Sequence, residues 1–150
     1  MSSVIEYTSI EYIKIFNPLN KFDAIKEIAG VFENTIICTD STLLINALLE
    51  REEIMSTGIG AGIAIPHAKI AVVKEMAFAI GVLKDGVNFD SMDGQPVHLI
   101  ILVAAGETQH KEYLRLLSNI MSIIKNEKIK ESIIQSKSPE EVYEILKSGE

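Results

Sequence analysis

The chain has 150 residues, of which 47% are hydrophobic and 23% are charged, and its formal net charge is −7 at pH 7. This composition excludes a disordered chain, and the length predicts a single domain over residues 1–150. The negative charge argues against a nucleic-acid surface, the apolar runs are too short for direct membrane insertion, and the lone Cys38 fits a reducing cytoplasm.

The first part of the chain predicts helices ahead of a glycine-rich segment. The expected elements are a short strand or helix over residues 10–16, an amphipathic helix over residues 20–32 and a second helix over residues 40–53. The first helix has Asn20 or Asp23 near its start, and either Asp40 or Ser41 can cap the second.

The segment REEIMSTGIGAGIAIPHAK, residues 51–69, holds the most informative pattern. Its glycines, Gly58 among them, can adopt positive φ in a loop and bring backbone N–H groups close to a ligand. Residues 63–65 predict a short buried strand, which Pro66 should end because proline has no N–H to donate. His67 is therefore expected at the mouth of a strand, where α/β proteins place their chemistry.

The remaining segments predict strands and then helices. The expected elements are a strand over residues 76–83 with a turn at residues 84–86, a buried central strand over Val97–Ala105, and helices over residues 114–124, 127–136 and 139–146. Strands and helices in this proportion predict an α/β fold with a small central mixed β-sheet flanked by helices on both faces.

His67 is the candidate reactive residue, because a neutral imidazole with a pKa of about 6.5 is nucleophilic near neutral pH. Arg51 is either a solvated charge at a helix end or a planar fork that holds phosphoryl oxygens. The glycine spacing lacks the nucleotide-binding patterns, and the histidines are scattered without metal-ligand spacing. We therefore expect no metal and no cofactor.

The stretch LEREEIMSTGIGAGIAIPHA resembles the signature of enzyme IIA domains of the fructose/mannitol/nitrogen-regulatory class of the bacterial phosphotransferase system. The shared pattern is an Arg-Glu pair, a Ser-Thr-Gly-x-Gly loop and an Ala-aliphatic-Pro-His sequence. The resemblance implies that His67 carries a phosphoryl group, that Arg51 binds it and that Thr57 lies beside it. It also implies an αβα fold.

This family usually places a second histidine at the start of the helix that follows the last core strand, and here Tyr113 occupies that position. His110 lies three residues earlier, on the same face if the helix already extends there. Either His110 supplies the imidazole, which we slightly favour, or Tyr113 substitutes as a hydroxyl donor. His98 alternates inside a buried strand and is interpreted as structural.

The resemblance implies a cytoplasmic phosphocarrier that accepts a phosphoryl group from the carrier protein HPr and passes it to a cysteine of an enzyme IIB domain. A nitrogen-type regulatory protein is the alternative, in which the phosphorylation state of His67 controls binding to other proteins. A third possibility is an unrelated α/β ligand-binding module with a structural histidine. Labelling by phosphoenolpyruvate with enzyme I and HPr separates the third hypothesis from the first two.

Overall fold

The computed structural model describes residues 3–149, and its strands form one six-stranded mixed sheet in the order β1-β5-β6-β3-β2, with β4 also paired to β6. The strands are β1 (Ile13–Phe16), β2 (Gly58–Gly60), β3 (Ile63–Ala64), β4 (His67–Lys69), β5 (Ala77–Val87) and β6 (Val97–Ala105). The helices are α1 (Lys21–Ala29), α2 (Ser41–Ile54), α3 (His110–Ile124), α4 (Glu127–Ile134) and α5 (Pro139–Gly149). Short 3-10 helices cover Val4–Tyr7, Ile10–Tyr12 and Gly30–Phe32.

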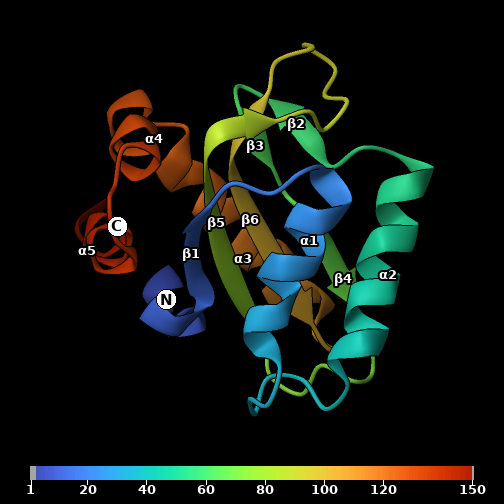
Figure 1. The fold of residues 1–150 in the computed structure, drawn as a ribbon. Helices are drawn as coiled ribbons and strands as arrows, with labels where there is room; N and C mark the ends of the chain where they lie inside the picture. Colours follow the sequence, from blue (N-terminus) through green and yellow to red (C-terminus); the bar gives the residue numbers. More distant parts are fainter. Residues whose placement is uncertain (1–2, 150) are drawn as a thin grey trace.

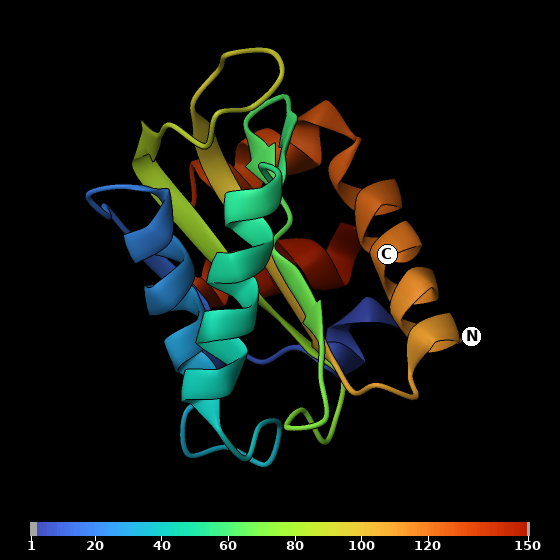
Figure 2. The same ribbon diagram turned by 90° about the vertical axis from the view of Figure 1, so that its right-hand side faces the viewer.

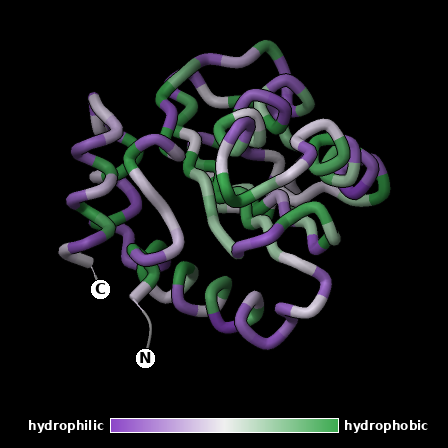
Figure 3. Tube along the Cα trace, turned by 90° about the horizontal axis from the view of Figure 1, so that it is seen from below, coloured by the Kyte–Doolittle hydropathy of each residue, from purple (hydrophilic) through white to green (hydrophobic). Residues whose placement is uncertain are grey.

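Helices cover both faces of the sheet, as the element pattern predicts (Figure 1). Helices α1 and α2 pack on one face, and α3, α4 and α5 pack on the other (Figure 2). Apolar and polar segments alternate along the helices in Figure 3, because each helix turns one side toward the sheet. The α/β fold class, with its central mixed sheet, is therefore confirmed.

Strand β6 lies at the centre of the sheet, and this position explains why its sequence is almost entirely apolar. It pairs antiparallel with β5 on one side and parallel with β3 and β4 on the other. Leu99, Ile101 and Val103 contribute to the core beneath α3, α4 and α5, whereas Ile100 and Leu102 contribute to the core beneath α1 and α2. Because both faces of the strand are covered, both sets of alternate positions are apolar except for the half-buried His98 near its start.

The predicted caps of the first two long helices are present. The side chain of Asn20 accepts a hydrogen bond from the Asp23 N–H at 2.9 Å, which caps α1. The side chain of Asp40 accepts one from the Leu43 N–H at 3.2 Å, which caps α2. These bonds satisfy N–H groups that have no partner within the helix.

Two predictions about strand boundaries need correction. Residues 84–86 were expected to form a turn, but β5 continues through them to Val87, with a register shift against β6 between Val82 and Val87. Gly86 has φ +76° within this irregular section, so its turn-like sequence produces a local distortion and not the end of the strand. Residues 10–16 contain both proposed structures, since the 3-10 helix Ile10–Tyr12 leads directly into β1.

Candidate functional site

His67 follows the end of β3 after a short interruption and is the first residue of β4. Strand β3 stops at Ala64, but pairing with β6 resumes at His67, the first residue of β4. Ala64 pairs with Ile100 and His67 with Val103, so the register is unchanged across Pro66. Strand β3 ends before Pro66, as expected, but the Pro66 carbonyl still accepts a hydrogen bond from the Val103 N–H at 3.0 Å, so contact with β6 continues into β4.

The imidazole of His67 has a defined neutral tautomer. Its Nδ1 atom lies 2.8 Å from the carbonyl oxygen of Ile65. Because a carbonyl oxygen can only accept a hydrogen bond, Nδ1 carries the proton and Nε2 keeps a free lone pair. The half-buried ring therefore offers Nε2 as a nucleophile.

His67 lines a cleft with a volume of about 780 Å³. The cleft also includes three other predicted site residues, Arg51, Thr57 and Gly58. The remaining lining residues are Met55, Ser56, Ile59, Ile65, Asp90, Met92, Leu117 and Met121. Residues from α2, the β2–β3 region, β4, the segment between β5 and β6, and α3 thus line one cleft together with His67.

Arg51 belongs to the last turn of α2, and its Nη1 donates to the carbonyl oxygen of Met55 at 2.7 Å. This bond satisfies a carbonyl beyond the helix end and holds the side chain against the cleft wall. A guanidinium has five N–H donors in a planar fork, so further donors remain for an anion in the cleft.

Thr57 is 5% exposed and is held by the carboxylate of Glu52. Its N–H lies 3.0 Å from Glu52 Oε2, and its hydroxyl donates to Glu52 Oε1 at 2.5 Å. Lys21 reaches the same carboxylate at 3.3 Å and also pairs with Asp90 at 3.1 Å. Burial lowers the pKa of Lys21, but the bonds to Asp90 and Glu52 outweigh burial and raise that pKa above 10.5.

Sequence reasoning did not assign a role to Glu52, Lys21 or Asp90. Glu52 is part of the quoted Arg-Glu pair, but its 2% exposure depends on how α2 packs and has no signature in the sequence. Lys21 and Asp90 are far from this helix in the chain, so only the fold brings them to Glu52.

The glycine-rich segment forms a short hairpin in place of the expected loop. Strand β2 pairs antiparallel with β3, and Gly60, Ala61 and Gly62 have φ values of +92°, +57° and +79°. The Ala61 N–H donates to Asp93 at 2.9 Å, and the Ala61 carbonyl accepts from Lys130 at 3.0 Å. The N–H groups of Ala61 and Gln95 lower the pKa of Asp93 because they favour its charged form.

The ring of Tyr113 lies close to the imidazole rings of both His67 and His110. Its ring centroid lies 5.9 Å from that of His67 and 6.5 Å from that of His110. Tyr113 is 4% exposed, and burial raises its pKa to about 12 although the Arg51 charge opposes this effect. His110 is exposed at the start of α3, with its Nδ1 2.5 Å from Lys69 Nζ. Neither Tyr113 nor His110 is among the residues that line the cleft.

His98 contributes to the sheet, in agreement with its structural interpretation. Its Nδ1 lies 3.0 Å from the carbonyl oxygen of Leu83, which links β6 to β5 beside the register shift.

Among residues 3–149 no group of three or more His, Cys, Asp or Glu side chains is placed to hold a metal ion. No helix in the same range is long and apolar enough to cross a bilayer.

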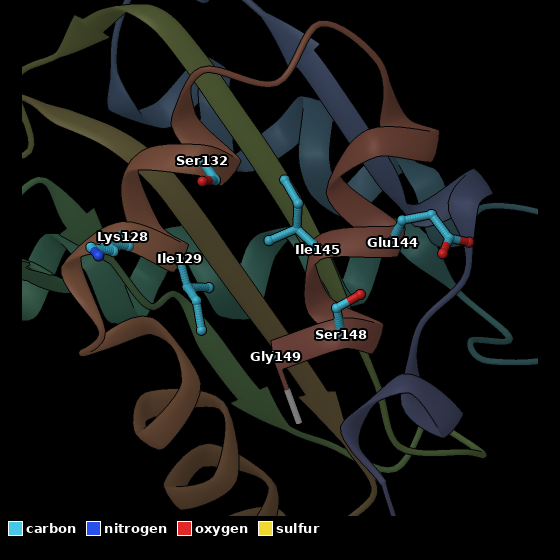
Figure 4. Close-up of a pocket in the computed structure, with 7 residues that line it drawn as sticks. All are labelled: Lys128, Ile129, Ser132, Glu144, Ile145, Ser148 and Gly149. Carbon is cyan, nitrogen blue, oxygen red and sulfur yellow. The ribbon is translucent and has the colours of Figure 1, made fainter.

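A second cavity, of about 340 Å³, lies between α4 and α5 and is lined partly by Ile129 and Ile145 (Figure 4). None of the predicted site residues lines it. The cleft at His67 therefore remains the candidate functional site.

Comparisons with known proteins show the family of the chain. Residues 6–149 match the family profile described as "Phosphoenolpyruvate-dependent sugar phosphotransferase system, EIIA 2". The chain is 38% identical over 126 residues to the fructose-specific EIIABC component of Bacillus subtilis; the match covers 84% of the chain but only 20% of that longer protein.

Two solved structures show the same fold. The nitrogen regulatory protein IIA-Ntr from Neisseria meningitidis is 30% identical, with a TM-score of 0.87 and coverage of 95% of this chain and 98% of that one. The mannitol enzyme IIA of Escherichia coli, determined in complex with phosphorylated enzyme IIB, is 21% identical with a TM-score of 0.80; the match covers 93% of this chain and 96% of that one.

Proposed function

Because the chain belongs to the EIIA 2 family of the phosphoenolpyruvate-dependent sugar phosphotransferase system, we propose that it is a cytoplasmic phosphohistidine carrier with His67 as the acceptor. The donor is the phosphohistidine of HPr, and the next acceptor is a cysteine of an enzyme IIB domain. The observation that carries the proposal is the free Nε2 lone pair of His67, which the Nδ1 bond to Ile65 defines, in a cleft that it shares with Arg51.

The first transfer moves PO₃ between two nitrogens. Nε2 of His67 attacks the phosphorus while the P–N bond to the HPr imidazole breaks, and the electrons of that bond return to the departing ring. The proton on Nδ1 of His67 stays in its bond to Ile65, which supports the positive charge that the phosphorylated ring acquires. In the second transfer a cysteine thiolate attacks the same phosphorus, a P–S bond forms, and the His67 imidazole leaves.

Phosphoryl transfer of this kind needs positioning and compensation of charge on the equatorial oxygens. Arg51 is the cation that lines the cleft, and its fork geometry suits two phosphoryl oxygens. The buried side chain of Ile65 and the half-exposed side chain of Ile59 provide apolar surface that limits access of water to the phosphohistidine. The Tyr113 ring lies beside that of His67, with centroids 5.9 Å apart, and Tyr113 is a candidate for the position of the family's second histidine.

A radioactive phosphoryl group tests the proposal. With labelled phosphoenolpyruvate, enzyme I and HPr, we expect acid-labile label on the wild-type chain and none on His67→Ala. His98→Asn is the matched control, because it replaces a histidine that bonds Leu83 in the sheet outside the cleft, and it should keep the label. Absence of label on the wild-type chain, or full label on His67→Ala, contradicts the proposal.

The regulatory alternative is supported by the similarity to IIA-Ntr, which is the higher of the two structural matches described above. In that case the phosphorylation state of His67 controls binding to other proteins. A chase of the labelled chain with purified fructose- or mannitol-type enzyme IIB separates the two functions. Movement of the label to IIB supports a sugar-transport carrier, whereas label retained on His67 favours the regulatory function.

A further inference from the structure

A buried carboxylate lies directly behind the wall of the cleft. Glu52 follows Arg51 in α2, and its side chain is 0% exposed. Its oxygens accept hydrogen bonds from the N–H and the hydroxyl of Thr57, a residue that lines the cleft. The steps proposed above for phosphoryl transfer do not use this buried charge.

The bond to Glu52 determines what the Thr57 hydroxyl can offer to a ligand. Lys21 and the Thr57 N–H both donate to Glu52, so its oxygens act as acceptors and the hydroxyl proton of Thr57 points toward them. A hydroxyl has one proton, and thus only lone pairs of Thr57 remain for the cleft. Phosphoryl oxygens are themselves strong acceptors, so Thr57 in this state gives them no hydrogen bond.

The charges around Glu52 also oppose an added phosphoryl group. The ammonium of Lys21 is shared between Glu52 and Asp90, at 3.3 and 3.1 Å. One cation facing two carboxylates leaves this trio with a net negative charge, and Asp90 itself lines the cleft. A phosphoryl group adds about −1.5 to −2 charges, so its presence there is disfavoured.

We propose that Glu52 is a positioning residue that acts through Thr57 to make the phosphorylated form of His67 less stable and thus easier to discharge. The inference rests on the proposed carrier function. A carrier must release the group that it accepts, and a donor withheld from the phosphoryl oxygens keeps the P–N bond at a higher free energy. Arg51 binds the group, while Glu52 limits how tightly it is held.

The test uses potassium phosphoramidate, a small phosphoryl donor, in a buffer that also contains ammonia. The P–N bond of the donor breaks and ammonia leaves, while a new P–N bond forms at Nε2 of His67. The measured quantity is the equilibrium ratio of phosphorylated to free protein. In Glu52→Gln the amide can donate to Thr57 Oγ1 and release the hydroxyl proton toward the cleft, so we expect this ratio to rise about tenfold.

The double variant Glu52→Gln/Thr57→Val separates the hydroxyl from the charge. The account predicts that most of the rise disappears when the hydroxyl is absent. Damage to the fold would change the ratio in the opposite direction, because a distorted cleft binds the phosphoryl group less well. An unchanged or lower ratio in folded Glu52→Gln, or an equal rise in the double variant, overturns the inference.

A second variant covers the case in which Glu52→Gln leaves Lys21 without its buried partner and does not fold. Glu52→Gln/Lys21→Met removes both charges of the pair, which is less costly than removal of one. Its ratio should still rise several-fold above wild type, since the Thr57 hydroxyl is released, and no rise overturns the inference. If wild-type protein takes up no phosphoryl group at all, the carrier function fails instead, so the two failures are distinguishable.

Discussion

The Nδ1 atoms of His67 and His110 have partners of different kinds. Nδ1 of His67 donates to the Ile65 carbonyl, whereas Nδ1 of His110 faces the ammonium of Lys69, which can only donate. The neutral His67 ring therefore has a free Nε2, and the neutral His110 ring carries its proton on Nε2. The first is suited to attack phosphorus, and the second to donate a hydrogen bond. Two histidines that look alike in the sequence thus have opposite chemical properties.

Replacement of Arg51, even by lysine, should slow phosphoryl transfer. Lysine keeps the charge but lacks the planar guanidinium, which can donate hydrogen bonds to the Met55 carbonyl and to a phosphoryl group at the same time. We expect Arg51→Lys to lower kcat/KM for phosphoryl transfer from HPr by about 10²-fold, the scale for loss of a donor to a charged transition state. Arg115→Lys is the control, since Arg115 is the only other arginine of the chain and lies exposed on α3. Equal rates in the two variants contradict a phosphoryl-binding role for Arg51.

Tyr113 should make the stability of the protein fall at high pH. Its pKa is raised from 10.0 to about 12 in the folded state, so below pH 10 the tyrosine is neutral in both states and its contribution is complete. Between pH 10 and about 12 the unfolded chain loses the proton first, and the free energy of unfolding decreases. Urea unfolding at pH 9 and pH 11 should show a smaller decrease for Tyr113→Phe than for wild type. Identical decreases would show that Tyr113 is not desolvated.

The sequence predicted most elements but not how they end. Hydrophobic periodicity identified α1, α2 and the long β6, because these features depend on which side chains face the core. Pro66 and Gly86 were interpreted as strand ends; β3 does end before Pro66, although β4 resumes the pairing with β6 at His67, whereas β5 continues through Gly86. In each case the chain stays paired because of hydrogen bonds to the neighbouring β6, and such partners are absent from a local sequence window.

The β2–β3 hairpin requires glycine at position 58 because of its contact with the segment between β5 and β6. A Cβ built on Gly58 would lie 2.1 Å from Ser91 Oγ and 3.2 Å from Phe89 Cβ. We expect Gly58→Ala to lower the free energy of unfolding by about 1–3 kcal/mol, as overpacking typically does. It should also slow phosphoryl transfer, since Gly58 lines the cleft.

Gly30→Ala is the matched control for Gly58→Ala. A Cβ there meets nothing within 4 Å, and the backbone is already helical with φ −62°. This substitution should be neutral or stabilise the protein by about 0.4–1 kcal/mol through the unfolded state. Urea denaturation of both variants measures the difference, and equal stability of the two would contradict the close packing of the hairpin.

For the whole molecule, the sequence predicted the layers and four of the twelve residues that line the cleft. His67, Arg51, Thr57 and Gly58 belong to one continuous stretch, so their common location could be predicted from a local pattern. Met92, Leu117 and Asp90 reach the cleft from the β5–β6 connection and from α3. Their positions depend on the strand order, in which β6 lies between β5 and β3, and no local pattern specifies that order.

The most direct test of the account is the identity of the phosphorylated atom. ³¹P and ¹H–¹⁵N NMR of the protein, after phosphorylation by phosphoenolpyruvate, enzyme I and HPr, can assign the phosphorus to one imidazole nitrogen. The account predicts one phosphoryl group on Nε2 of His67, with the Nδ1 proton retained in its bond to Ile65. Phosphorus on Nδ1 of His67, on His110 or on a residue outside the cleft would contradict it.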